Sequence, residues 1–196
     1  MSRSGVHIPS EPMTSDEFIA WAVRERPGRV ELIDGIVVPK EDGGPTGMAG
    51  DNPRHNLAKV NAGMAFRTAL AGRGCRVYVD GISVRASDRT SYIPDVLVDC
   101  AADADLSNPV ATEPTIIVEV LSASSHIKDT VEKLDGYFSL PTIRHYLIVD
   151  AVKRRIVLHS RNGDGIATAI MSGGAVRLDP PGCTVDLDTF WEGLPT

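Results

Sequence analysis

The sequence predicts an α/β domain, of the mixed α+β kind, and three observations favour this class. The chain has 196 residues, a length at which one domain is the default. Capped helix patterns alternate along it with short runs that are rich in β-branched residues. Residues 115–121 are nearly all apolar, which is typical of a strand that is covered on both faces and therefore lies centrally in its sheet.

The first predicted helix covers residues 14–27 and is followed by a hairpin. Thr14 and Glu17 form a capping box, in which each side chain satisfies a backbone N–H group of the other residue. A Pro-Gly pair ends this helix, and residues 29–39 then form two short strands around an Asp-Gly turn.

Two segments are expected to lack regular structure. Residues 1–12 are interpreted as a flexible tail, which leaves 13–196 as the single domain. Residues 39–53 contain four glycines and three prolines, too many for a helix or strand to persist, and are expected to form a mobile loop.

Two further helices are predicted, with strands before, between and after them. The second helix covers residues 54–71 and stops at a pair of glycines, and the third covers 126–139 and stops before Pro141. The expected strands lie within 76–86, 93–98, 115–121, 144–149 and 155–159, with weaker signals at 166–170 and 184–187.

The cysteines and the lengths of the apolar runs indicate the cellular compartment in which the protein is expected. Cys75, Cys100 and Cys183 are odd in number and far apart, so neither a disulfide framework nor a cysteine-rich zinc site is expected. The first ten residues lack the apolar core of a signal peptide, and no apolar run reaches the roughly 18 residues of a membrane span. A cytoplasmic protein without a membrane partner is the expectation.

Glu119 is the residue that breaks the pattern around it. It is a carboxylate inside an apolar strand, where an unpaired charge would be prohibitively costly. One interpretation is a residue at a strand end that is paired with a structural arginine. The other is a metal ligand or general base, and Asp95 favours it because this aspartate begins another apolar strand 24 residues earlier.

Asp129, Lys133 and Tyr137 recur at four-residue spacing in the third helix and therefore share one helical face. They could simply contain a solvated Asp–Lys pair. Alternatively, Lys133 could reach back toward Glu119, where its ammonium would steady an attacking water beside a metal.

Glu31 and His55 are two further candidates. Glu31 lies in a predicted strand, where it could equally be on the exposed side of an alternating pattern. His55 begins the second helix, and the helix dipole would favour a neutral imidazole that can donate a hydrogen bond or bind a metal. A surface histidine is the alternative. The other histidines show no metal-ligand spacing, so a zinc site is not expected.

The order of these motifs resembles the Uma2 family. The motifs are Val-Glu-Leu-Ile-Asp-Gly, a helix that begins with histidine, Pro-Asp-Val, Val-Glu-Val-Leu-Ser, Asp-x-x-x-Lys-x-x-x-Tyr and Tyr-x-x-Val-Asp, in order from Glu31 to Asp150. Uma2 proteins are similar to the PD-(D/E)XK nuclease superfamily. The resemblance implies a restriction-endonuclease-like fold, with a central mixed sheet flanked by helices, and a divalent metal held by carboxylates.

The resemblance also implies roles for individual residues. Asp95 and Glu119 match the motif acids that hold Mg²⁺ or Mn²⁺, with the Val120 carbonyl as a further ligand and Glu31 as the upstream acid. Leu121 stands where the superfamily has its lysine, so Lys133 from the following helix is the expected substitute. His55, Asp129 and Tyr137 are assigned supporting roles.

The implied function is a Mg²⁺-dependent endonuclease or phosphodiesterase that acts on nucleic acid, with DNA as the expected substrate, and that works as a homodimer. A catalytically silent protein of the same fold, which binds nucleic acid or a protein partner, is the first alternative. A structural component of a homo-oligomer, with the acids as solvated surface, is the second. Fold analogy does not decide among them.

The charge distribution is compatible with the nuclease hypothesis. The 26 acidic and 20 basic residues give a net charge of −6, which on average discourages contact with phosphates. Residues 52–79 and 152–163, however, are basic and contain no acid, whereas 90–127 contain six acids and no Lys or Arg. An acidic centre framed by basic segments suits a site that cuts phosphodiester bonds. Basic segments, however, often face solvent without contacting any phosphate.

Overall fold

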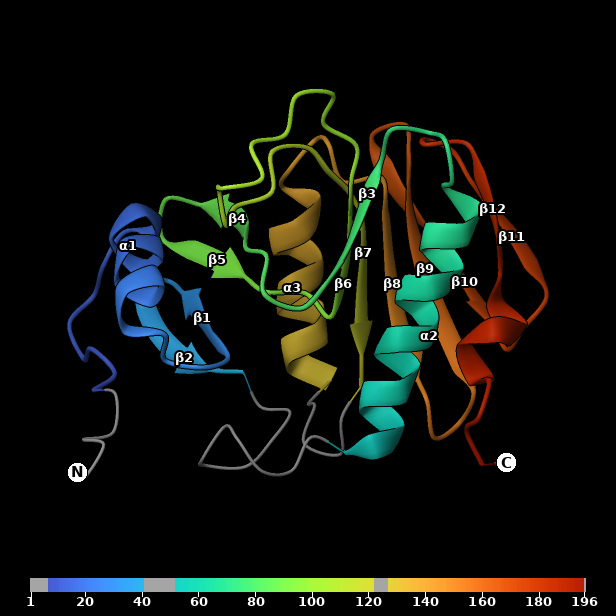
Figure 1. The fold of residues 1–196 in the computed structure, drawn as a ribbon, viewed down its shortest axis with the longest axis horizontal. Coiled ribbons are helices and arrows are strands. Elements are labelled where there is room, and N and C mark those ends of the chain that lie inside the picture. Colours follow the sequence, from blue (N-terminus) through green and yellow to red (C-terminus); the bar gives the residue numbers. More distant parts are fainter. Residues whose placement is uncertain (1–6, 41–51, 122–126, 196) are drawn as a thin grey trace.

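The computed structural model describes residues 7–40, 52–121 and 127–195, and it describes no side chain between 122 and 131. Within these ranges the chain forms two main sheets, a small two-stranded sheet, three α-helices and a short 3-10 helix (Figure 1). Residues 1–6 of the predicted tail and 41–51 of the predicted loop lie outside the described residues.

The large sheet has six strands in the order β10-β9-β8-β7-β6-β3. Its central strand β7 (Pro114–Val120) is parallel to β8 (His145–Asp150) and antiparallel to β6 (Val96–Asp99). The outer strands are β3 (Arg76–Val79), β9 (Arg155–Asn162) and β10 (Gly165–Met171). All seven residues of β7 are buried, so the prediction of a central strand covered on both faces is confirmed.

Helices α2 (Pro53–Ala69) and α3 (Ile127–Phe138) cover opposite faces of the large sheet. Since successive strand residues point to opposite faces, each face has its own apolar cluster. The α2 cluster contains the helix residues Ala58, Ala62 and Phe66 and the sheet residues Val96, Val98, Ile116 and Val118. The α3 cluster contains the helix residues Tyr137 and Phe138 and the sheet residues Leu97, Ile117 and Tyr146.

Four strands from the N-terminal half of the chain form a second sheet, in the order β2-β1-β5-β4. Helix α1 (Ser15–Glu25) begins with the predicted capping box and packs Phe18 and Trp21 against this sheet. The strands are β1 (Val30–Ile33), β2 (Ile36–Pro39), β4 (Val84–Ser87) and β5 (Thr90–Tyr92). The predicted helix and hairpin are therefore confirmed.

Residues 76–86 differ from the prediction because the chain changes sheets there. β3 belongs to the large sheet and β4 to the small one, and the turn between them contains Asp80 and Gly81 at positive φ. Three short elements went unpredicted or were only partly predicted: β5, the strand β11 (Ala175–Leu178) that pairs with β12 (Cys183–Asp186), and the 3-10 helix η1 (Leu187–Trp191). Strands of three or four residues are too short to give a clear periodic signal.

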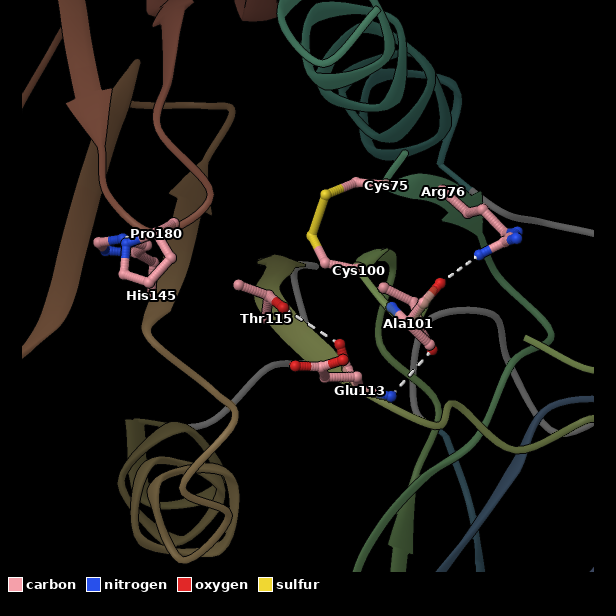
Figure 2. Close-up of a disulfide and its surroundings, with 9 residues drawn as sticks. Cys75, Arg76, Cys100, Ala101, Glu113, Thr115, His145 and Pro180 are labelled. Atoms are coloured by element: carbon pink, nitrogen blue, oxygen red, sulfur yellow. Dashed lines mark hydrogen bonds between the residues drawn. A yellow bond between two sulfur atoms is a disulfide. The ribbon is translucent and has the colours of Figure 1, made fainter. Parts of the chain in front are cut away.

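The expectation for the cysteines is wrong for two of the three. Cys75 and Cys100 form a disulfide between the chain segments that flank β3 and β6 (Figure 2). Because Arg76 pairs with Asp99 in antiparallel register, Cys75 and Cys100 fall opposite each other. Their separation of 25 residues conceals this proximity, which depends on the strand pairing. Cys183 is a free thiol in the core.

No helix among the described residues combines the length and the apolar character needed to cross a membrane.

Candidate active site

Asp95 and Glu119 meet across two neighbouring strands. Asp95 directly precedes β6 and Glu119 is the next-to-last residue of β7, and the antiparallel register that pairs Val96 with Val118 brings them opposite each other. Both residues are buried, with 1% and 7% of their surface exposed. Two buried carboxylates at one point need positive charge around them.

Lys40 supplies the charge that links the two carboxylates. Its ammonium Nζ lies 3.0 Å from Asp95 Oδ1 and 3.0 Å from Glu119 Oε2, and it donates a 2.7 Å hydrogen bond to the Ile93 carbonyl. Burial opposes the charged form, but Glu119 and Asp95 outweigh it and raise the pKa of Lys40 above its ordinary value. This lysine is therefore a permanent cation between the two acids.

Lys133 and Tyr137 come from α3 and bind the other oxygen of Glu119. Lys133 Nζ lies 3.0 Å from Glu119 Oε1, and the Tyr137 hydroxyl donates a 2.8 Å hydrogen bond to the same atom. Burial opposes the charge on Lys133, but Glu119 and Glu31 raise its pKa. Lys133 therefore reaches back to Glu119, as one of the two interpretations of the four-residue spacing expected. The side chain of Asp129 lies outside those that are described.

Glu31 is buried, not on the exposed side of its strand. Only 3% of the surface of Glu31 is exposed. Its Oε1 accepts a 2.9 Å hydrogen bond from Lys133 Nζ and a 3.0 Å hydrogen bond from the Ile93 N–H group. Lys133 therefore bridges Glu31 and Glu119, as Lys40 bridges Asp95 and Glu119. The Lys133 bridge joins the small sheet, through Glu31, to the large sheet, through Glu119.

His55 holds the backbone beside the acid pair. Its Nε2 lies 2.9 Å from the Val120 carbonyl, and because a carbonyl only accepts, this nitrogen carries the proton. The Val120 N–H group donates a 2.7 Å hydrogen bond to Asp95 Oδ2. Burial opposes ionisation of Asp95, but Lys40, His55 and Val120 together hold the pKa of this carboxyl well below its usual range.

Three further ion pairs extend the set of charges around Asp95. Arg29 lies 2.9 Å from Asp95 Oδ1 and 2.7 Å from Asp80, and Lys59 lies 3.1 Å from the other oxygen of Asp80. We call the resulting set the ion-pair cluster. Its members are the acids Glu31, Asp80, Asp95 and Glu119 and the bases Arg29, Lys40, Lys59 and Lys133.

The donor set around Lys40 suits a hard divalent cation. Two carboxylate oxygens and the Ile93 carbonyl already surround one positive charge, and oxygen atoms are the ligands that Mg²⁺ prefers. No three His, Cys, Asp or Glu side chains are arranged to hold a metal ion in the part of the chain that the structure describes. Magnesium commonly uses one or two carboxylates and takes its remaining ligands from water and substrate phosphate, so the pair fits this ion.

Several basic side chains of the two basic segments make contacts within the fold. Lys59 is buried against Asp80, Arg76 donates to the Ala101 carbonyl, and Arg161 donates to the carbonyls of Phe138, Leu140 and Ile143. Basic side chains that remain exposed in the two predicted segments include Arg67, Arg73, Lys153 and Arg155. The counts of basic residues therefore overstate the surface available to a phosphate backbone.

Lys40 and Arg29 were missed by the sequence reasoning. Both flank the β1–β2 hairpin, and Lys40 lies 79 residues from the glutamate that it contacts. The available signal was electrostatic, because an acid pair predicted to be buried requires cations, but the sequence did not indicate which lysines would supply them.

The mixed sheet with helices on both faces defines a protein of the restriction-endonuclease-like fold class. The chain belongs to the Uma2 family, since the profile of that family, described as "Putative restriction endonuclease", matches residues 15–187. The predicted family and fold class are both confirmed.

Two proteins of known sequence and one solved structure are similar to this chain. Two uncharacterized proteins of Synechocystis are similar in sequence. The protein slr1290 is 26% identical over 194 residues, which cover 96% of this chain and 97% of the relative. The protein sll1609 is 27% identical over 137 residues, which cover 68% and 73%. A crystal structure from Anabaena variabilis, described as a putative nuclease of the DUF820 group, superposes with a TM-score of 0.67 over 92% of this chain and 98% of its own. The identity is 13%, so this likeness concerns the fold.

Proposed function

We propose that this protein is an endonuclease that hydrolyses phosphodiester bonds in nucleic acid, with DNA as the first substrate to test, by means of water activated by Mg²⁺ or Mn²⁺. The observation that carries the proposal is the convergence of Asp95 and Glu119 on one cation position, between neighbouring strands of this fold. Membership of the Uma2 family supports the same reaction class.

Asp95 and Glu119 would hold the ion through their carboxylates, with the Ile93 carbonyl that now contacts Lys40 as a further ligand. The Val120 carbonyl, which was expected in that role, accepts a hydrogen bond from His55 instead. When bound, the ion supplies an activated water and stabilises negative charge that develops on the phosphate. His55 orients the Val120 peptide, whose N–H group in turn fixes Asp95 Oδ2. This contact leaves Asp95 Oδ1 directed at the cation position.

The two oxygens of Glu119 would have separate tasks. Oε2 faces the cation position, whereas Oε1 is held by Lys133 and Tyr137. Lys133 would orient the attacking water and is itself fixed by Glu31. Glu31 would also receive a second ion or part of the water shell of the first.

The direct test is cleavage of single-stranded, duplex, branched and RNA substrates with Mg²⁺ or Mn²⁺. We expect cleavage by the wild type and a loss of at least about 100-fold in Glu119→Gln and in Lys133→Met, because each change removes a group that acts on the ion or the water. Glu113→Gln is a matched control, since it changes an exposed glutamate just before β7. Equal cleavage by wild type and Glu119→Gln would contradict the proposal.

The catalytically silent alternative has one observation in its favour. Glu119 and Asp95 already have Lys40, Lys133, Arg29 and Tyr137 as partners, so the acid pair is compensated without any metal. On this alternative the protein binds nucleic acid or a protein partner without cutting. Binding of a nucleic acid with no cleavage by any of the metal-loaded samples would favour it.

We place this activity in the cytoplasm, where nucleic acid is accessible. Cytosolic thiol systems would keep Cys75 and Cys100 reduced, so the fold would have to persist without the disulfide.

A further inference from the structure

The first inference concerns Lys40 and rests on the proposed function. The ion-pair cluster contains four carboxylates, Glu31, Asp80, Asp95 and Glu119, and four basic groups, Arg29, Lys40, Lys59 and Lys133, so these eight side chains carry no net charge. A divalent cation added to these eight side chains, of which Arg29 and Asp80 are only partly buried, would leave two positive charges in excess among them. Excess positive charge is most costly beside the buried pair Asp95 and Glu119, so metal binding there is favoured when a basic group leaves the two acids.

Lys40 is the group whose position the ion needs. Its Nζ is the atom that contacts both motif acids and the Ile93 carbonyl, at 3.0, 3.0 and 2.7 Å. Lys133, by contrast, contacts Glu119 and Glu31 and lies over the Tyr92 ring at 5.5 Å from its centroid. Loss of Lys133 would therefore not open the space between Asp95 and Glu119.

We propose that Lys40 occupies the cation position in the metal-free protein and that a divalent ion binds Asp95 and Glu119 by displacing its ammonium. Lys40 then acts as a positioning residue: it keeps the acid pair assembled until the ion arrives. The apparent affinity for the ion is lowered by this competition, in the same way that a minor binding-competent state lowers an apparent affinity.

The test is the affinity for Mn²⁺, measured by calorimetry on the wild type, on Lys40→Met and on Lys133→Met. We expect Lys40→Met to bind Mn²⁺ about tenfold or more tightly than the wild type, since the competitor is gone. Lys133→Met removes the same charge from the same cluster but leaves Lys40 in place, so its gain should be smaller. Equal gains in the two variants, or no gain in Lys40→Met, would overturn the proposal.

A second measurement uses the wild type alone and is independent of how the variants fold. The Lys40 ammonium is acylated with an amine-specific reagent, with and without Mn²⁺, and the modified peptide is quantified by mass spectrometry. Lys40 should be protected without the ion, because 9% of its side chain is exposed, and should become reactive when the ion binds. Protection that persists at saturating Mn²⁺ overturns the displacement. Displacement without cleavage would preserve this inference while contradicting the proposed nuclease.

A second inference concerns β10, which is an edge strand of the large sheet (Figure 1). Among the described residues β10 pairs with β9 alone. Six of its seven residues are exposed, and Ile166 and Ile170 have 42% and 69% of their surface exposed. The strand contains no charge and no proline, although natural sheets usually protect a free edge with such residues.

The hairpin register determines which backbone groups face outward. Asn162 pairs with Gly165 across a two-residue turn, and the closing pair of such a turn is hydrogen-bonded. Because bonded and non-bonded pairs alternate along an antiparallel ladder, the N–H and C=O groups of Ile166, Thr168 and Ile170 point away from β9. These groups are available to another strand.

The sequence of β10 is suited to pairing with itself. Residues 166–170 read Ile-Ala-Thr-Ala-Ile, which is the same in both directions. Antiparallel pairing of two copies about Thr168 therefore places Ile166 opposite Ile170, alanine opposite alanine and threonine opposite threonine. We infer that two copies of this chain associate through β10, joining their large sheets into one continuous sheet with twofold symmetry.

A charge exchange tests this pairing. The doubly substituted Ile166→Lys/Ile170→Lys variant would place lysine opposite lysine twice, and the corresponding glutamate variant would place glutamate opposite glutamate twice. In sedimentation or light-scattering measurements we expect a dimer for the wild type and monomers for each double variant. An equal mixture of the two variants should re-form a dimer.

Leu106→Lys is the control, since Leu106 is 76% exposed and lies outside the strands. It should retain the mass of the wild type. A monomeric wild type, a lysine variant that keeps the dimer mass, or a mixture that remains monomeric would overturn the proposal. None of these outcomes depends on nuclease activity.

Discussion

At the scale of single residues, the acid pair could be predicted and its partners only in part. Glu119 is conspicuous because a carboxylate in an apolar strand must be compensated, and Asp95 follows from its place before the adjacent strand. Lys133 and Tyr137 could be proposed because helical spacing puts them on one face. Lys40 could not, because its contact with Glu119 depends on how the N-terminal hairpin packs against the large sheet.

Tyr137 gives a prediction about the energetics of this site. Its buried hydroxyl donates to Glu119 Oε1, and burial and the nearby carboxylate raise the pKa of Tyr137 well above its usual range, so the hydroxyl remains a donor. Tyr137→Phe should lower the free energy of unfolding by about 1.5 to 3 kcal/mol, the usual loss for a hydrogen bond to a charged group. Urea unfolding measures this change.

Tyr146→Phe is a matched control for that experiment. Tyr146 is also fully buried and its ring lies 5.1 Å from that of Tyr137, but its hydroxyl has no hydrogen-bond partner among the described residues. Removing this hydroxyl should leave stability unchanged or slightly increased. An equal loss in both variants would show that volume or ring packing, and not the bond to Glu119, determines the effect.

At the scale of elements, predictability follows the length and composition of each segment. The capping box of α1, the Asp-Gly hairpin and the apolar strand β7 each have a local cause and were predicted. The sheet to which β3 and β4 belong is set by long-range pairing, and the sequence between them shows only a turn. The same long-range pairing of β3 with β6 makes neighbours of Cys75 and Cys100.

The disulfide between these elements should stabilise the fold without being required for it. A crosslink that spans 25 residues removes unfolded-state entropy worth about 3.5 kcal/mol. The β3–β6 pairing and the α2 core do not depend on it. The Cys75→Ser/Cys100→Ser variant should therefore stay folded but lose about this much unfolding free energy relative to the oxidised wild type.

Reductant provides the control. With dithiothreitol present, the wild type and the double serine variant should unfold at nearly the same denaturant concentration, because both then lack the crosslink. Circular dichroism would follow both transitions. Unfolding of the variant without denaturant would contradict this account, and would also argue against activity in a reducing cytoplasm.

At the scale of the whole molecule, the site lies where the two sheets meet. Glu31 comes from the small sheet, Asp95 and Glu119 from the large one, and α2 and α3 contribute His55 and Lys133 from its opposite faces. The net charge of −6 therefore does not describe the site, where four acids balance four basic groups among the residues that the structure describes. A site assembled from both sheets also depends on the stability of the entire fold.

His145 makes that global stability depend on pH. Its Nε2 lies 3.0 Å from the Pro180 carbonyl and must carry the proton there, while Nδ1 lies 2.9 Å from the Ser160 hydroxyl and accepts its proton (Figure 2 shows His145 beside Pro180). This arrangement satisfies the neutral ring, and burial lowers the pKa of His145 below its ordinary value near 6.5.

The sign of the effect follows from proton linkage. The unfolded chain binds a proton to this histidine at a higher pH than the folded chain does, so the stabilisation is fully present above the unfolded pKa near 6.5, declines below it, and is lost as the pH falls through the lower folded pKa. The slope is at most about 1.4 kcal/mol per pH unit, the value for one proton.

His145→Gln should lack this component, so its unfolding free energy should fall less steeply between neutral and mildly acidic pH. His7→Gln changes an exposed histidine and should keep the wild-type profile in urea unfolding. Parallel profiles for wild type and His145→Gln would mean that this ring takes up its proton at the same pH in the folded and the unfolded chain, in conflict with its burial and with the hydrogen bond that Nδ1 accepts from Ser160.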